Sequence, residues 1–170
     1  MSIDRKHSRL YPKGTAYHEA GHAVMRAKLC LEPTAIEVSR NGGGLTHGTG
    51  KQHRWSGQYA VWHHAVYSLA GAYSEARACK VSATSLLVSG GALDDWQHAK
   101  EDLDWLVVQG FETDHGAAER RAVEMTRDAI KENWQWITAI AERLRVVGRL
   151  EAKEVAELLA GLPVRHTHHD

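Results

Sequence analysis

The sequence has little of several features that define whole classes of protein. Its two cysteines, Cys30 and Cys79, form no CxxC pair, so a disulfide framework is excluded and a reducing, cytoplasmic location is expected. With 3 prolines and no internal repeat, the chain is not collagen-like. Lys plus Arg and Asp plus Glu both number 21, so no charge excess favours nucleic acid or an anionic membrane as a partner. No apolar run approaches the roughly 20 residues of a transmembrane helix.

The composition that remains is typical of a soluble globular domain. With 43% apolar and 25% charged residues over 170 positions, the chain can bury one core, and disordered or coiled-coil classes are excluded. We expect a flexible basic N-terminus over residues 1–12, a single domain over 13–162, and a disordered, histidine-containing tail over 163–170. No apolar segment follows the basic N-terminus, so no signal peptide is expected. The tail could bind metal adventitiously, so bulk metal binding alone would identify no site.

Hydrophobic periodicity predicts a mostly helical chain. Thr15 is expected to cap the first helix, Asp94 or a neighbour the third, and Asp114 the fourth, because such side chains accept hydrogen bonds from free backbone N–H groups. The expected helices cover residues 15–29, 56–80, 94–109 and 114–133, followed by one that ends at 147 and a short one over 151–160.

One small β element is expected between the first two helices. Residues 34–39 alternate between apolar and polar side chains and predict a strand, and residues 45–49 return as a second strand or edge segment after a glycine turn. The predicted fold class is therefore α+β, predominantly helical, with a first helix, a small β element and a C-terminal helical bundle.

The first predicted helix carries the pattern HExxH, formed by His18, Glu19 and His22. Residues four apart share one face of a helix, so the two imidazoles can bind one metal ion, with Zn–N distances of about 2.0–2.1 Å. Glu19 is rotated by about 100° from His18 and lies beside the ion, where its carboxylate can take a proton from water. Gly21 costs a helix about 1 kcal/mol relative to alanine, which indicates that a neighbouring helix or a substrate chain approaches closely.

A catalytic zinc ion normally has three protein ligands, so a third must come from elsewhere in the chain. Spacing in the sequence leaves four candidates open: Glu75, Asp94, Asp95 and His98. An aspartate at a helix start is also common as a capping residue, so residue spacing alone selects none of the four.

The order of several motifs resembles the peptidase domain of FtsH-type AAA zinc metalloproteases. That family carries a HEAGHA helix, then an AG-x-x-x-E pattern, then a helix start of the form GA-x-x-D-x-x-x-A. A weaker pattern, L-x-x-x-E-x-x-x-L-L, follows near the C-terminus, so the similarity covers about residues 11–162. The matching positions are residues 17–23, Ala70, Gly71, Glu75, Gly91, Ala92, Asp95, Ala99 and residues 150–159.

The resemblance implies a zinc site and assigns its members. The implied ligands are His18, His22 and Asp95, and the implied general base is Glu19. Glu75 and His98 are then supporting residues, since a carboxylate can accept the second N–H of a ligand imidazole. Zn²⁺ is the implied cofactor and a polypeptide is the implied substrate.

The sequence departs from that family in one respect that changes the expected function. The family joins this domain to a membrane anchor and an ATPase module, and the ATPase motif GxxxxGK[ST] is absent here. We therefore expect ATP-independent hydrolysis of peptide bonds in flexible or unfolded polypeptides, with zinc-activated water and Glu19 as the general base. A separate unfoldase or a homo-oligomer remains open as a partner.

The predicted strand suggests how a substrate could bind. If the strand around residues 36–39 offers an exposed edge, an extended peptide can add to it through backbone hydrogen bonds, which tolerate many sequences. His47 could stabilise the oxyanion or lie on the surface. Two other functions stay open: a non-catalytic zinc-binding regulatory or adaptor domain of the same fold, and a narrow regulatory protease that acts on one protein.

Overall fold

The computed structural model describes residues 10–29, 31–32, 34–46, 57–89 and 91–163. The predicted N-terminal segment and tail lie mostly outside these residues. Within them, the chain forms a predominantly helical α+β fold with one three-stranded antiparallel sheet, as the sequence predicts. The elements are α1 (Lys13–Lys28), β1 (Ile36–Val38), β2 (Gly44–Thr46), α2 (Gly57–Cys79), α3 (Ala83–Ser89), α4 (Leu93–Val108), α5 (His115–Glu132), α6 (Trp134–Val147), β3 (Arg149–Leu150) and α7 (Ala152–Leu158).

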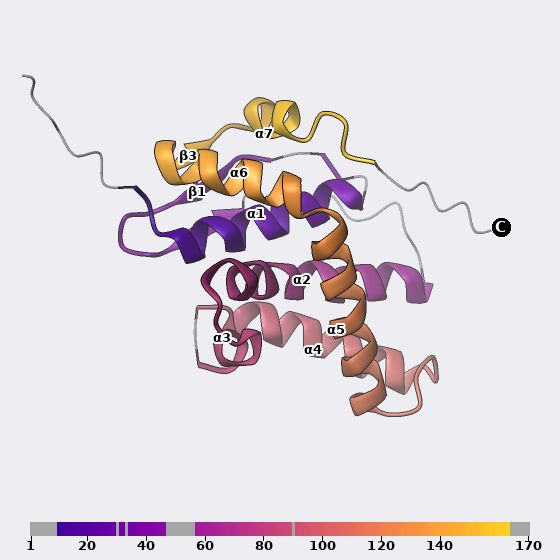
Figure 1. The fold of residues 1–170 in the computed structure, drawn as a ribbon. Helices are drawn as coiled ribbons and strands as arrows, with labels where there is room; N and C mark the ends of the chain where they lie inside the picture. The colour runs from indigo at the N-terminus through magenta and orange to yellow at the C-terminus, as the bar shows by residue number, and fades with distance from the viewer. Residues whose placement is uncertain (1–9, 30, 33, 47–56, 90, 164–170) are drawn as a thin grey trace, which may run out of the picture.

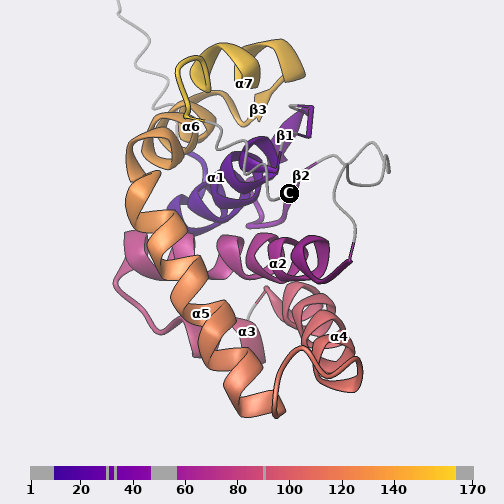
Figure 2. The same ribbon diagram turned by 90° about the vertical axis from the view of Figure 1, so that its right-hand side faces the viewer.

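The helix α2 runs through the middle of the molecule and separates two layers (Figure 1). On one side lie α1, the sheet, α6 and α7, and on the other side lie α3 and α4. The helix α5 runs from the α4 layer to the start of α6 (Figure 2). Each layer has its own core cluster, and α2 supplies Val66 and Ala70 to the first and Leu69 and Ala72 to the second. A helix that packs on both sides needs apolar residues all round, which explains the composition of α2.

The first helix begins two residues earlier than the sequence analysis expects. Pro12 occupies the cap position with a φ of −53°, which suits a helix start, and its carbonyl accepts a hydrogen bond from the N–H of Ala16 at 3.1 Å. The prediction that Thr15 caps this helix is therefore wrong. Thr15 lies in the first turn, and its hydroxyl donates to the carbonyl of Gly42 at 2.9 Å, which joins α1 to the β1–β2 turn.

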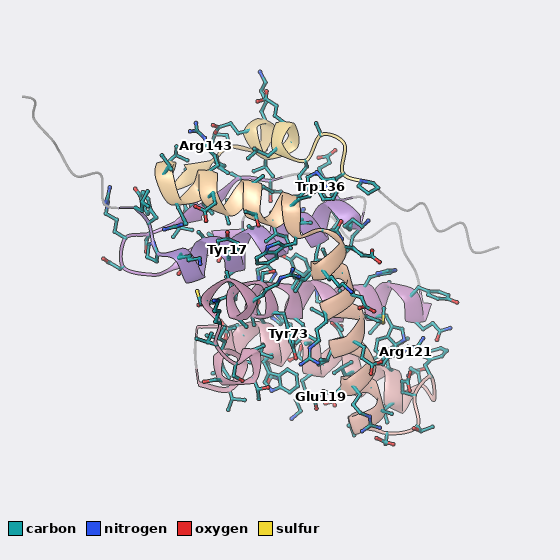
Figure 3. The ribbon with its side chains drawn as sticks, in the orientation of Figure 1. Tyr17, Tyr73, Glu119, Arg121, Trp136 and Arg143 are labelled. Atoms are coloured by element: carbon teal, nitrogen blue, oxygen red, sulfur yellow. The ribbon has the colours of Figure 1, made fainter. Side chains whose placement is uncertain are left out.

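Tyr17, labelled in Figure 3, joins α1 to α6. Its hydroxyl donates to Oε1 of Glu142 at 3.0 Å, and its ring stacks on Trp134 with the centroids 5.4 Å apart. Burial, together with the neighbouring Glu142 carboxylate, raises the pKa of this phenol, so it stays protonated as a donor. These contacts attach one side of α1 to α6. The next residue, His18, lies on the side of α1 that faces α2.

The sheet has the order β2-β1-β3, with β1 in the centre. Ile36 pairs with Thr46 on one side and with Leu150 on the other. The prediction of an exposed edge at residues 36–39 is therefore wrong, because both sides of β1 are occupied. Within the described residues, the outer side of β2 pairs with no strand. The two-residue strand β3 was not expected; it follows Gly148, whose φ of 78° ends α6 and turns the chain back.

The remaining helices follow the predicted ranges with two differences. Asp114 caps α5 as predicted, because its carboxylate accepts a hydrogen bond from the N–H of Ala117 at 2.8 Å. Asp94 does not cap α4; the cap position is Ala92, and Asp94 lies in the first turn. The helix α3 was not predicted, since seven residues are too few to show a helical period. None of the described helices has both the length and the apolar character needed to cross a bilayer.

Candidate metal centre

The two histidines of the HExxH pattern lie on the face of α1 that packs against α2. His18 and His22 are both buried, and their Nε2 atoms are 3.1 Å apart. The rings meet edge to face, with centroids 4.8 Å apart and planes inclined by 69°. One helical turn separates the two residues, so α1 alone brings the two nitrogens together, as the sequence predicts.

Two glycines allow α1 and α2 to approach closely at this point. A Cβ on Gly71 would come within 2.6 Å of Nε2 of His18 and would also overlap Nε2 of His22. A Cβ on Gly21 would lie 2.5 Å from Oγ of Ser74 and 2.6 Å from the carbonyl oxygen of Ala70. Gly21 therefore lies at a close contact with a neighbouring helix. This is one of the two explanations that the sequence analysis offers for a glycine within α1, the other being a substrate chain. Gly71 leaves space in front of both imidazole nitrogens.

Asp95, in the first turn of α4, completes the group from the other layer. Its Oδ2 lies 2.9 Å from Nε2 of His18 and 3.3 Å from Nε2 of His22. One ligand atom from each of the three residues lies within 4.8 Å of the others. The side chains expose 11% for His18, 7% for His22 and 23% for Asp95, so the group opens to solvent on the aspartate side.

The other candidates for a third ligand lie outside this group. Asp94 is exposed, one residue before Asp95 and therefore about 100° away around α4. His98 is also exposed on α4 and does not belong to the group that Asp95 forms with the two histidines. Glu75 contacts the opposite nitrogen of His18, with Oε2 3.3 Å from Nδ1. Asp95 thus lies with the Nε2 atoms of the two histidines, while Glu75 lies on the Nδ1 side of His18.

The outward nitrogens of both imidazoles have acceptors that fix the rings. Nδ1 of His22 donates to the backbone carbonyl of Tyr67 at 3.0 Å, and Nδ1 of His18 faces the carboxylate of Glu75. A proton held on Nδ1 leaves the lone pair of Nε2 directed into the group, which is the tautomer that a metal ion needs. Sequence reasoning missed Tyr67, because the interaction uses a backbone carbonyl and no side-chain pattern reports it.

Glu19 is 6% exposed and lies under the strand β2. Its Oε2 accepts a hydrogen bond from the hydroxyl of Thr46 at 2.7 Å. Gly44 packs directly against the same carboxylate, and a Cβ there would overlap Glu19 and approach Thr15 to 2.6 Å. Sequence reasoning did not name Thr46 or Gly44, although the predicted second strand and glycine turn mark the segment. This segment therefore orients Glu19 and brings β2 beside the group.

The electrostatics of the group favour a positive charge in its centre. Burial opposes charge on His18, but its hydrogen bonds to Asp95 and Glu75, together with the charges of Asp95 and Glu19, raise its pKa to about 9. Burial alone would raise the pKa of Asp95, yet its contacts with the two histidines hold it well below its usual value. A proton on His18 therefore neutralises part of the negative charge of the carboxylates, as a bound cation would.

These residues fit a divalent transition metal. Two imidazole nitrogens and one carboxylate oxygen form the donor set of many catalytic zinc sites, and three protein ligands leave a coordination position open. Glycine at position 71 keeps clear the space that a Cβ would fill in front of both Nε2 atoms. His47, a candidate for oxyanion stabilisation, lies outside the described residues.

Comparison of the sequence with models of known protein families gives no match, and comparison with curated proteins gives none either.

Proposed function

We propose that this chain is an ATP-independent zinc metalloendopeptidase, related in its site to the FtsH-type proteases that its motifs resemble. One observation carries the proposal: Asp95 of α4 lies against His18 and His22 of the HExxH helix, with ligand atoms within 4.8 Å. The carboxylate that completes the HExxH pattern, Glu19, is buried, and its charge acts on His18. Two imidazoles, one carboxylate and an adjacent second carboxylate are the parts that metal-assisted hydrolysis of an amide requires.

The three residues His18, His22 and Asp95 would hold the ion. Imidazole and carboxylate ligands with an open position favour Zn²⁺ among the divalent metals. Bound zinc would polarise the scissile carbonyl and lower the pKa of water toward about 7. Glu75 and the carbonyl of Tyr67 would keep the imidazoles in the required tautomer through their contacts with Nδ1.

Glu19 acts in this mechanism as the general base and then as the general acid. Its carboxylate takes a proton from the attacking water and later gives that proton to the leaving amine. The hydroxyl of Thr46 donates to Oε2 of Glu19, which fixes the orientation of the carboxylate. Since Glu19 is 6% exposed, bulk solvent competes little for this proton.

An extended polypeptide is the substrate that the neighbouring strand would accept. The outer side of β2 has no partner strand within the described residues, and Thr46 of this strand contacts Glu19. A peptide that adds to this side through backbone hydrogen bonds would pass the metal-binding group without a strict sequence requirement. We expect this chain to cleave flexible or unfolded segments, or to receive them from a separate unfoldase. Neither nucleic acid nor a membrane is part of the proposal, and the isolated cysteines support a cytoplasmic location.

The substitution Glu19→Gln tests the proposal on an unfolded substrate such as casein. We expect it to retain zinc and to lose at least about 100-fold in cleavage rate, which is the scale of general acid–base catalysis. The matched control is Glu124→Gln, the same change at an exposed residue of α5, and it should cleave like the wild type. Cleavage undiminished by Glu19→Gln would contradict the proposal.

Two further results separate the alternatives. A zinc-loaded wild-type protein that is inert toward many unfolded peptides, yet binds one specific partner, would favour the adaptor function. Cleavage of one protein, with no activity across a peptide library, would favour the narrow regulatory protease.

A further inference from the structure

The register of the sheet decides which backbone groups of β2 face its open side. The N–H of Ser39 donates to the carbonyl of Gly43 at 2.7 Å, so these residues form a hydrogen-bonded pair next to the β1–β2 ladder. In an antiparallel ladder, such pairs alternate with pairs whose backbone groups point away from each other. Leu45, two residues after Gly43, therefore directs its backbone groups to β1. The backbone groups of Gly44 and Thr46 are directed to the open side of β2.

The hydrogen bond on the other side of β1 agrees with this register. The N–H of Val38 donates to the carbonyl of Gly148, just before β3, at 2.7 Å. Val38 lies opposite Gly44 in the ladder, so its backbone groups point away from β2 and those of Gly44 point away from β1. No strand among the described residues pairs with the open side of β2. Gly44 and Thr46 thus each offer one N–H and one C=O group to an added peptide.

The same two residues contact the proposed general base through α1. The hydroxyl of Thr46 donates to Oε2 of Glu19 at 2.7 Å. Gly44 packs on the same side chain, since a Cβ there would lie 2.8 Å from Cγ of Glu19. Leu45, between them, points to the opposite face of the sheet and is 50% exposed. Gly44 and Thr46 therefore lie between the path of a peptide and Glu19.

The strand β2 has few contacts that hold it in place. It has three residues, and within the described part of the chain only β1 pairs with it. Gly44 and Leu45 are exposed. A short strand that is bonded on one side opens locally at little cost. A peptide that pairs with the other side adds backbone hydrogen bonds and restricts Thr46, and with it the hydroxyl that holds Glu19.

We infer that Thr46 is a positioning residue that couples the pairing of an extended peptide with β2 to the orientation of Glu19. The inference rests on the proposed function and concerns the same site. The backbone of Thr46 bonds the peptide, while its hydroxyl holds the carboxylate for proton transfer. Binding energy from parts of the peptide outside the reacting bond then raises kcat and not only affinity. The preferred substrate is therefore a peptide long enough to pair with β2.

Peptides of different length test this coupling in the wild type. A fluorogenic peptide of about four residues surrounds a bond that the protein cleaves in casein, and a second extends it to about twelve residues. A third is the long peptide with N-methylated backbone outside the central residues, which removes the N–H groups needed for pairing. We expect kcat of the long peptide to exceed that of the other two at least about tenfold. Equal kcat for all three would overturn the inference, whereas failure to cleave casein at all would overturn the proposed function and the inference with it.

The substitution Thr46→Val tests the role of the hydroxyl, because valine keeps the shape of threonine. We expect kcat for the long peptide to fall at least about tenfold, toward that of the short one, with KM within about threefold of the wild type. The backbone groups that pair with the peptide are unchanged. Thr46→Ser keeps a hydroxyl and should restore most of kcat. An unchanged kcat in Thr46→Val would overturn the inference.

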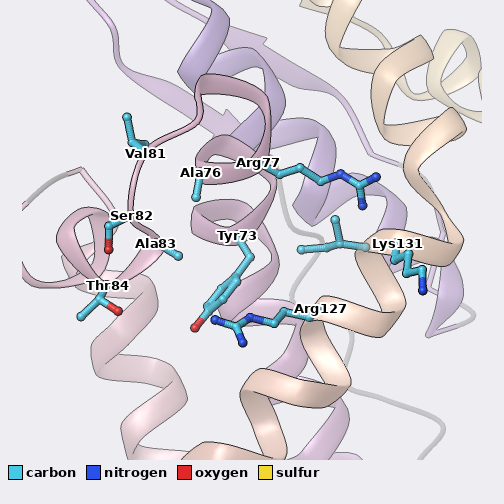
Figure 4. A pocket seen from close by; sticks show the side chains of 10 residues that line it. Tyr73, Ala76, Arg77, Val81, Ser82, Ala83, Thr84, Arg127 and Lys131 are labelled. Carbon is cyan, nitrogen blue, oxygen red and sulfur yellow. The ribbon is translucent and has the colours of Figure 1, made fainter.

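Two controls carry the same change at other threonines. Thr15→Val removes the hydroxyl that joins Gly42 to α1 and leaves the contact between Thr46 and Glu19. Thr84→Val lies on α3, in a pocket that no residue of β2 lines (Figure 4). Both should keep the ratio of kcat between long and short peptides within about twofold of the wild type. A loss in Thr15→Val as large as that in Thr46→Val would show that the hydroxyls only attach the hairpin, and would overturn the inference.

Peptide binding to the metal-free full chain separates pairing from chemistry. Fluorescence anisotropy with the labelled long peptide should give dissociation constants within about threefold of each other for the wild type and Thr46→Val. The N-methylated peptide should bind at least about tenfold more weakly to both. Circular dichroism checks that the variants fold. A loss of affinity in Thr46→Val as large as its loss of kcat would mean that Thr46 acts in binding alone, which would overturn the coupling.

Discussion

The two helix contacts that assemble the metal-binding group differ in kind. Between α1 and α2, the backbones approach closely at Gly21 and Gly71, and the residues around them are buried. Between α2 and α4, a polar pair lies at the contact: Nδ1 of His64 is 2.6 Å from Oδ2 of Asp102, and these side chains expose 39% and 19%. The first contact holds two ligands by close packing, while the second, which brings Asp95 from the other layer, adds a partly solvated polar pair to its buried apolar residues.

This difference predicts different losses of stability and of metal binding for substitutions at the two contacts. Changes at the α1–α2 contact should damage the histidine pair and the fold together, because close-packed interiors relax little around an added atom. Changes at the His64–Asp102 pair of the α2–α4 contact should have small effects on stability, because partly exposed polar pairs contribute little. We expect the largest loss for a change at Gly71, a smaller one at Gly21 and the smallest at His64.

The substitution Gly71→Ala should have the largest effect. Its Cβ would enter the space in front of both Nε2 atoms, 2.6 Å from that of His18. We expect zinc affinity to fall at least about 100-fold and stability to fall by about 1–3 kcal/mol. Competition with a chromogenic chelator measures the first, and chemical denaturation measures the second.

The control for Gly71→Ala is Gly91→Ala, which adds the same methyl group close to the start of α4. A Cβ on Gly91 would meet nothing within 4 Å, so zinc affinity and stability should both remain near wild-type values. Both variants keep the histidine-containing tail, so adventitious binding there is equal in the two. Wild-type zinc affinity in Gly71→Ala would mean that the ion does not lie between the two histidines.

The substitution Gly21→Ala should cause the next largest loss, and a double-mutant cycle with Ser74→Ala tests its cause. A solvent-exposed Gly→Ala change in a helix stabilises by about 1 kcal/mol, yet here the added Cβ would meet Oγ of Ser74 and the carbonyl of Ala70. We therefore expect Gly21→Ala to destabilise by about 1–3 kcal/mol in chemical denaturation.

The second arm of that cycle removes one of the two clashes. Ser74→Ala should lower stability by no more than about 0.5 kcal/mol, because Oγ of Ser74 is buried without a hydrogen-bond partner among the described residues and no bond is lost. The double variant should recover only part of the loss, since the carbonyl of Ala70 stays in place. A Gly21→Ala protein as stable as the wild type would show that α1 and α2 are not in close contact here.

The smallest effect is expected for His64→Gln, and it should depend on pH. The hydrogen bond to Asp102 raises the pKa of His64 above its usual 6.5, against burial, which lowers it. A pKa that is higher in the folded state gives stability that is fully present below about pH 6.5 and is lost as the pH rises through the folded-state pKa. Since the side chain is 39% exposed, solvent screening keeps the contribution below about 1 kcal/mol.

Denaturation of wild type and His64→Gln at pH 5.5 and pH 9.5 measures this difference. The gap in stability between the two proteins should be larger at pH 5.5, and Asp102→Asn should show the same pattern. A gap that grows with pH would contradict the assignment of a charged pair at the α2–α4 contact.

The sequence predicts those features that depend on neighbouring residues. The helical spacing of His18 and His22 places both imidazoles on one face, and the structure has them there. The helix ranges and the cap at Asp114 also follow from local patterns. Spacing alone left Asp94 and Asp95 equal as ligands, and the choice of Asp95 came from the family resemblance. The two aspartates differ by about 100° around α4, so the orientation of that helix against α2 decides which one reaches the histidines.

The features that sequence analysis missed or assigned wrongly depend on distant contacts. β1 lost its predicted exposed edge because Leu150, more than a hundred residues later, pairs with Ile36. Thr15 bonds to Gly42 across a turn, so it does not cap its own helix. The contact between Thr46 and Glu19 requires the sheet to fold over α1. No local period or spacing encodes such contacts.

A crystal soaked with zinc and measured at the zinc absorption edge would show whether the three residues hold the ion. We expect one strong anomalous peak at about 2.0–2.2 Å from Nε2 of His18, Nε2 of His22 and a carboxylate oxygen of Asp95. A map with no peak between the two histidines, or with zinc bound to them and Asp95 out of reach, would contradict it.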